Sequence, residues 1–75
     1  MKYVIATGAY DFAIIKLIHS KGLVTHTEHS LGGSQECTSM TYDFAQAQQV
    51  RDALIKDGAD PAKIRIQYPS PKDAS

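Results

Sequence analysis

The order of apolar and polar side chains divides the chain into short segments of distinct periodicity. Lys2–Thr7 is rich in β-branched and aromatic residues and precedes Gly8, which predicts a strand buried on both faces. Leu23–His29 and Glu36–Tyr42 alternate with a period of two, which predicts two further strands, the first with one face in water. Alternation over Ile64–Tyr68 predicts the last strand.

The clearest helical pattern covers Phe44–Asp57. Asp43 and Gln46 have the spacing of a capping box, and Gly58 is placed to end the helix. Asp52 and Lys56 form an i,i+4 pair of opposite charge in the favourable order. One stripe of the helix is apolar and comprises Phe44, Ala47, Val50, Leu54 and Ile55.

The segment Asp11–Lys21 fits two structures. As a helix it begins at Asp11 and ends before Gly22, with a broad apolar arc. As a strand it has two mostly apolar faces and ends in a hairpin turn. The tetrapeptide Tyr-Asp-Phe-Ala occurs at Tyr10–Ala13 and again at Tyr42–Ala45, before the clear helix. We therefore favour the helix and keep the strand as the alternative.

These elements predict an α+β fold: a two-layer sandwich in which helix 43–57 packs on one face of a small antiparallel sheet. With both helices the order is βαββαβ. With 11–21 as a strand the order is βββ(β)αβ, and the apolar far face of the sheet would need a partner. Residues 1–68 are expected to form a single α+β domain, and 69–75 a flexible C-terminal tail with two prolines.

The second half of the chain resembles the closing α–β unit of many ferredoxin-like domains. The residues that carry the resemblance are Tyr-Asp-Phe-Ala at Tyr42–Ala45, then Val50, Ala53, Leu54, Gly58, Ile64 and Ile66. With the first Tyr-Asp-Phe-Ala unit, the two-unit plan also resembles that of peptidoglycan-binding SPOR domains. Both resemblances imply a fold and carry no ligand to this chain.

Size and composition narrow the class of protein. A chain of 75 residues has room for one thin core, and self-association is a common remedy for its small size. Eight basic and eight acidic side chains cancel, which argues against a protein that coats nucleic acid by bulk charge. The single Cys37 excludes an intramolecular disulfide, and the first apolar run is too short for a signal peptide or a membrane span. We expect a cytoplasmic protein with no membrane partner.

The histidines and the cysteine are the first candidates for chemistry. His26, His29 and Cys37 are residue types that bind zinc, but an odd separation places the two histidines on opposite faces of a strand. They stay weak metal candidates. Cys37 is more typical of a small apolar side chain in a strand than of a nucleophile, and no pair of carboxylates marks an acid and a base. We expect no enzyme and no cofactor.

Two further groups are candidates for binding. Ser30–Ser34 is a predicted loop, and the backbone of Gly32 and Gly33 could bind an anion, although a flexible connection is the simpler interpretation. Arg51, Lys63 and Arg65 could form a modest basic patch. The tyrosines are expected in the core and at its rim.

The sequence therefore predicts a small non-enzymatic module that binds another protein and forms a homodimer. Proteins of this size and plan include accessory or inhibitor proteins of phages and other mobile elements. One alternative is a small-ligand or metal-binding domain that uses residues 25–37. Another is a nucleic-acid binder that acts through Arg51, Lys63 and Arg65.

Overall fold

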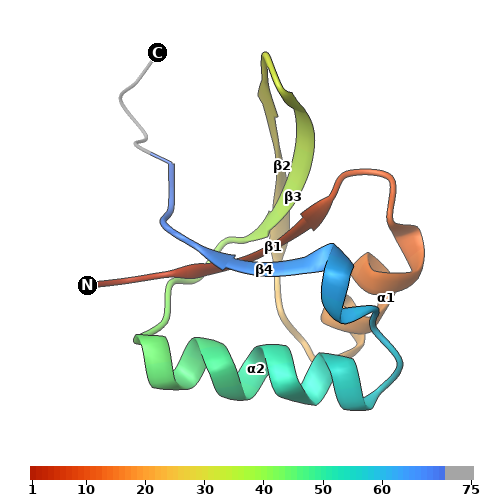
Figure 1. Cartoon of the computed structure of the whole chain (residues 1–75), viewed down its shortest axis with the longest axis vertical. Helices are drawn as coiled ribbons and strands as arrows, with labels where there is room; N and C mark the ends of the chain where they lie inside the picture. Colours follow the sequence, from red (N-terminus) through yellow and green to blue (C-terminus); the bar gives the residue numbers. More distant parts are fainter. Residues whose placement is uncertain (71–75) are drawn as a thin grey trace.

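The element order is βαββαβ, as the helical interpretation of both repeat units predicts (Figure 1). A computed structural model describes residues 1–70. Its elements are β1 (Val4–Gly8), α1 (Phe12–Ser20), β2 (Thr25–Ser30), β3 (Gly33–Thr38), α2 (Phe44–Lys56), the short 3-10 helix η1 (Pro61–Lys63) and β4 (Ile64–Gln67).

The four strands form one antiparallel sheet in the order β2-β3-β1-β4. Both helices lie on the same face of this sheet, and the opposite face carries no helix (Figure 1). The order of elements and of strands agrees with the ferredoxin-like plan. The predicted two-layer α+β sandwich is confirmed.

The alternative in which 11–21 is a strand is wrong. Ile14 and Ile18, four residues apart, lie on one side of α1 and are both buried in the core. The amide of Ile15 donates to the Asp11 carbonyl at 3.0 Å, which is a helical hydrogen bond. Alternating side chains of a strand would have exposed half of this apolar arc on the sheet's second face.

Both helices begin and end where the repeated pattern predicts. Asp11 precedes α1 and Asp43 precedes α2, where the Gln46 side chain accepts a hydrogen bond from the Asp43 amide at 3.2 Å. Gly22 and Gly58 follow the two helices with φ of 81° and 118°, a region that side chains with a Cβ rarely occupy.

The core lies between the sheet and the two helices. Ile5, Ile18, Leu54 and Ile64 are its largest fully buried apolar side chains. On the other face, Val4, Ala6 and Cys37 form a second, smaller buried cluster, so β1 is buried on both faces as predicted. The predicted stripe of α2 is correct except at its first residue, because Phe44 is 49% exposed.

The boundaries of β3 differ from the prediction of a strand over Glu36–Tyr42. Continuing the β1–β3 register, in which Ala6 is opposite Cys37, would bring Tyr3 opposite Met40. Tyr3 instead forms an isolated bridge with Tyr42. The strand ends at Thr38 because the Thr38 side chain, and not a ladder carbonyl, accepts the Ile5 amide at 3.1 Å.

The β2–β3 hairpin also begins and ends differently from the prediction. The predicted loop over Ser30–Ser34 is reduced to a turn at Leu31 and Gly32, because Ser30 still pairs with Gly33. The hairpin projects beyond the other two strands (Figure 1). The prediction of one wet face on the first hairpin strand is incomplete: exposed residues lie on both faces of β2.

Two observations concern the ends of the chain and membranes. Of the predicted tail 69–75, Pro69 and Ser70 are described, and 71–75 lie outside the described residues. Ser70 Oγ donates to the Glu28 carboxylate at 2.8 Å, so this residue is tied to the sheet.

Within residues 1–70, neither helix has the length and apolar character needed to span a membrane.

Candidate functional site

The open face of the sheet brings together two of the predicted metal candidates. His26 on β2 is directly opposite Cys37 on β3, and both side chains lie on the face without helices. His29 is three residues along β2 from His26 and therefore lies on the opposite face, where its ring contacts Ser34 Oγ at 2.7 Å. The prediction that His26 and His29 lie on opposite faces of one strand is thus confirmed.

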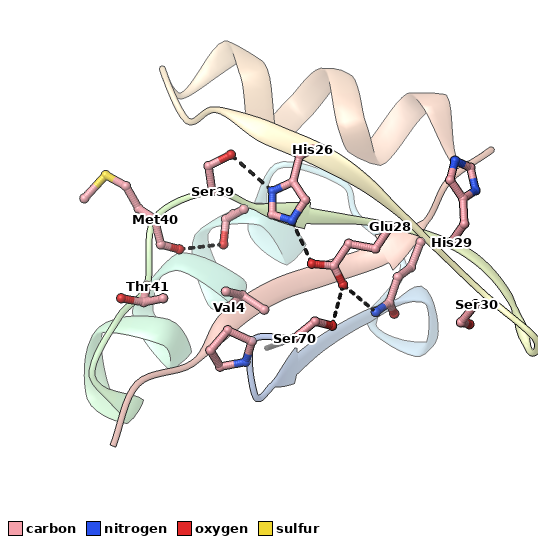
Figure 2. Close-up of a pocket in the computed structure, with 12 residues that line it drawn as sticks. Val4, His26, Glu28, His29, Ser30, Ser39, Met40, Thr41 and Ser70 are labelled. Atoms are coloured by element: carbon pink, nitrogen blue, oxygen red, sulfur yellow. Dashed lines mark hydrogen bonds and ion pairs between the residues drawn. The ribbon is translucent and has the colours of Figure 1, made fainter. Parts of the chain in front are cut away.

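A chain of hydrogen bonds crosses the open face (Figure 2). His26 contacts Ser39 Oγ at 3.3 Å through Nδ1 and the Glu28 carboxylate at 2.7 Å through Nε2. Glu28 also accepts from the side chains of Gln35 and Ser70. These hydrogen bonds, that of His26 above all, hold the pKa of the Glu28 carboxyl below its usual value.

A shallow hollow of about 900 Å³ lies over this network. Val4 forms part of its floor, and the bend at Ser39 and Met40 and the Pro69–Ser70 segment border it (Figure 2). The lining combines the Glu28 carboxylate, the His26 ring, hydroxyl groups and apolar atoms. A small ligand with both polar and apolar groups fits this chemistry.

Cys37 lies below this surface and is only 1% exposed. Burial, together with the nearby Glu28 carboxylate, raises the pKa of the Cys37 thiol to about 11. The thiol is therefore protonated at neutral pH, the opposite of what a nucleophile or a zinc ligand needs. Within residues 1–70, no three histidine, cysteine, aspartate or glutamate side chains lie close enough together to hold a metal ion.

The predicted glycine site lies at the tip of the β2–β3 hairpin, away from the His26 network. Gly32 is in the turn, Gly33 begins β3, and both are exposed. Their neighbour Leu31 has a fully exposed side chain. The tip therefore presents backbone groups and one apolar side chain to solvent.

The three predicted basic residues have different surroundings. Arg51 on α2 donates to the backbone carbonyls of Ile64 at 3.1 Å and Pro61 at 2.9 Å, so it ties the helix to β4. Arg65 lies on the open face and donates to Gln35 Oε1 at 2.9 Å. Both arginines border a hollow of about 350 Å³ beside β4, and Lys63 is exposed outside its lining.

A cluster of exposed aromatic and apolar side chains lies where β1, α2 and β4 meet. The Tyr3 ring is 5.2 Å from the Phe44 ring, edge to face, and 5.2 Å from the Tyr68 ring, stacked. The hydroxyl of Tyr68 is 3.9 Å from the sulfur of Met1. Met1, Phe44 and Tyr68 are 86%, 49% and 59% exposed. We call Met1, Tyr3, Phe44 and Tyr68 the aromatic cluster.

The sequence pattern did not identify the aromatic cluster. The four tyrosines were expected in the core and at its rim, but Tyr10 and Tyr68 are exposed and only Tyr42 is buried. The cluster depends on the pairing of β1 with β4, which brings Tyr68 next to Tyr3. Strand pairing of this kind is not visible in the periodicity of either segment.

Comparisons with known proteins give no match: no family model, no curated protein and no solved structure is similar enough to this chain to count as a relative. The geometry of the described residues is therefore the basis for any functional proposal.

Proposed function

We propose that the protein is a non-catalytic protein-binding module that forms a homodimer and makes its contacts through the aromatic cluster. The observation that carries this proposal is the exposure of Met1, Phe44 and Tyr68 in one cluster around Tyr3. Aromatic side chains and methionine are enriched in protein interfaces, where a few large side chains supply most of the binding energy.

The cost of leaving this cluster in water supports the proposal. Burying a large apolar side chain stabilises a protein by roughly 1.5–3 kcal/mol. A chain of 75 residues has a thin core, so burying the three exposed large apolar side chains would add an amount that is significant beside its total folding free energy. A partner that covers the cluster would recover that energy.

A photo-crosslinking experiment tests the proposal with a control inside the repeat. Phe44 and Phe12 occupy equivalent positions in the two Tyr-Asp-Phe-Ala units, and both are exposed. A benzophenone amino acid replaces one or the other in the cells that express the chain. We expect protein adducts at position 44 well above those at position 12; equal yields, or none at position 44, would refute the proposal.

Small-ligand binding at the open face is a second candidate, supported by the hollow over His26 and Glu28. A fragment screen by NMR tests it, because a ligand should shift the Glu28 and Ser70 amides saturably. If no fragment shifts these amides, the candidate fails.

Other predictions about function stay predictions. For nucleic acid, Arg51 already donates to two backbone carbonyls, which weakens the proposed basic patch. We also propose a cytoplasmic location, based on the single buried Cys37, and a role as an accessory or inhibitor protein of a phage or mobile element, based on chain size.

A further inference from the structure

The outer edge of β4 presents unpaired backbone groups. In an antiparallel strand, the N–H and C=O groups of alternate residues point to the same side. The Ile5 amide is bonded to Thr38 on the β3 side of β1, so Ile5 does not bond to its β4 partner Ile66. The backbone of Ile66 therefore points away from β1, where no described strand continues the sheet.

A second observation gives the same orientation. The Ile64 carbonyl accepts from Arg51 on α2, so it too points away from β1, two residues before Ile66. Arg51 occupies this one acceptor. The N–H and C=O of Ile66 remain for another strand, and exposed edge groups of this kind are a template for pairing.

The surface beside this edge is hollowed and combines apolar with charged side chains. The hollow of about 350 Å³ is lined by Phe44, Gln48, Arg51, Asp52, Ile64, Arg65 and Ile66. It is continuous with the aromatic cluster through Phe44. Edge, hollow and cluster therefore form one surface made of α2 and β4.

We propose that β4 of a second copy of this chain pairs with this edge, antiparallel and around a two-fold axis at Ile66. This inference rests on the proposed function, because it specifies the contact through which the homodimer forms. The two sheets would become one sheet of eight strands, and the Ile66 residues of the two copies would exchange their N–H and C=O hydrogen bonds.

The register around Ile66 is self-complementary. It places Arg65 opposite Gln67 of the other copy, a pair that already meets within one chain, where Arg65 Nε donates to Gln67 Oε1 at 3.4 Å. It also places Tyr68 opposite Ile64 of the other copy, at the border of the hollow. The neighbouring register would set the two Arg65 side chains directly opposite each other, and like charges in that position are destabilising.

The helices fit the same arrangement. Within one chain α2 contacts both β4 and β1, so it lies over the seam between them. Strands are about 4.8 Å apart, so the two copies of α2 would lie two strand spacings, or about 10 Å, from each other. Packed helices are typically 8–10 Å apart.

The charges on the facing sides of the two helices are complementary. Arg51 and Asp52 both line the hollow. Asp52 makes no ion pair with any described residue, so the i,i+4 ion pair with Lys56 that the sequence predicts is wrong. A two-fold axis between antiparallel helices brings Asp52 of each copy toward Arg51 of the other. In a two-fold dimer the same surface of each copy faces the other, so charge complementarity requires both signs of charge in that surface. The surface of α2 and β4 has both.

Sedimentation equilibrium of the full chain tests the proposal. We expect a concentration-dependent mass that approaches twice the 8.2 kDa of one chain. Asp52→Lys should weaken the dimer at least about tenfold, because it places two more positive charges near the two Arg51 side chains. Gln49→Lys, on the same helix but outside the hollow, is the matched control and should leave the dissociation constant unchanged.

A variant that tightens the dimer distinguishes a change at the contact from a folding defect, because a folding defect would only weaken the dimer. Gln67→Glu should tighten the dimer about threefold, since it places a carboxylate opposite each Arg65. A chain that stays monomeric at millimolar concentration would overturn the proposal, as would a dimer that Asp52→Lys and Gln49→Lys affect equally. A monomer that still crosslinks to other proteins at position 44 would overturn this pairing and the homodimer, and would leave the binding of other proteins through the aromatic cluster standing.

Discussion

Replacing Thr38 with valine should destabilise the fold by removing one bridge between β1 and β3. The Thr38 side chain is fully buried, accepts the Ile5 amide at 3.1 Å and donates to the Met40 carbonyl at 3.1 Å. Valine keeps the shape and loses both hydrogen bonds. The bridge lies next to the Tyr3–Tyr42 pairing, so it helps to position Tyr3 in the aromatic cluster.

The magnitude follows from the burial of the groups left behind. Ile5 is fully buried, so its amide would lose its acceptor without access to water. A buried backbone group without a partner costs about 1–3 kcal/mol. A domain of this length has a total stability of roughly 4–11 kcal/mol, so the loss is a large fraction of the whole.

Urea unfolding followed by circular dichroism measures this loss. With a slope of about 1 kcal/mol per molar urea, Thr38→Val should lower the midpoint by about 1–3 M. Thr41→Val is the control, since Thr41 is exposed and should change stability by less than about 0.5 kcal/mol. If the two variants unfold at the same urea concentration, the Thr38 hydrogen bonds do not have the role described.

Three further predictions concern single sites. Cys37, whose pKa is raised to about 11, should not react with a thiol reagent at pH 7 unless the protein is unfolded; its contribution to stability is full below the thiol's unfolded pKa and is lost as the pH rises toward 11. Rapid reaction of the folded protein would contradict this. Carbon-13 NMR should give Glu28 a pKa below its usual value, and His26→Asn should raise it; the stability that Glu28 contributes is present above its usual pKa and is lost as the pH falls through the lowered one. An unchanged titration in the variant would exclude His26 as the cause. Gly58→Ala should cost at least about 1 kcal/mol because φ is 118°, and Gly32→Ala, without a positive φ, should cost less; equal midpoints would refute the backbone argument.

Local signals predicted the helices and their ends. The helix starts at Asp11 and Asp43 and the ends before Gly22 and Gly58 depend on neighbours along the chain, so they can be read from the sequence. The opposite orientation of His26 and His29 was predictable for the same reason, since strand geometry alone fixes it.

Features that depend on pairing between distant segments were not predictable in this way. Tyr10 and Tyr42 begin identical tetrapeptides, yet Tyr10 is exposed and Tyr42 is buried, because only Tyr42 pairs with Tyr3. The early end of β3 has the same origin, since the Thr38 side chain replaces a backbone acceptor for Ile5. Periodicity continues through such a position and cannot show it.

The same distinction between local signals and pairing of distant segments applies to the candidate surfaces. The sequence suggested Arg51 as part of a basic patch, but its two carbonyl acceptors lie in η1 and β4, beyond the helix. The aromatic cluster joins the two ends of the described chain to the start of α2. Only the strand order, with β4 at one edge, brings these residues together.

Amide hydrogen exchange at Ile66 tests most directly whether the protein associates with a second copy through the surface of α2 and β4. The Thr27 amide is the internal reference: Val24 bonds to Ser39 on the β3 side, and Thr27 lies an odd number of residues further along, so its backbone points to the open edge of β2. We expect protection of the Ile66 amide to increase with protein concentration while that of Thr27 stays low. An Ile66 amide that exchanges as fast as Thr27 at every concentration would contradict the pairing of β4 and remove the main structural support for this surface as the site of self-association.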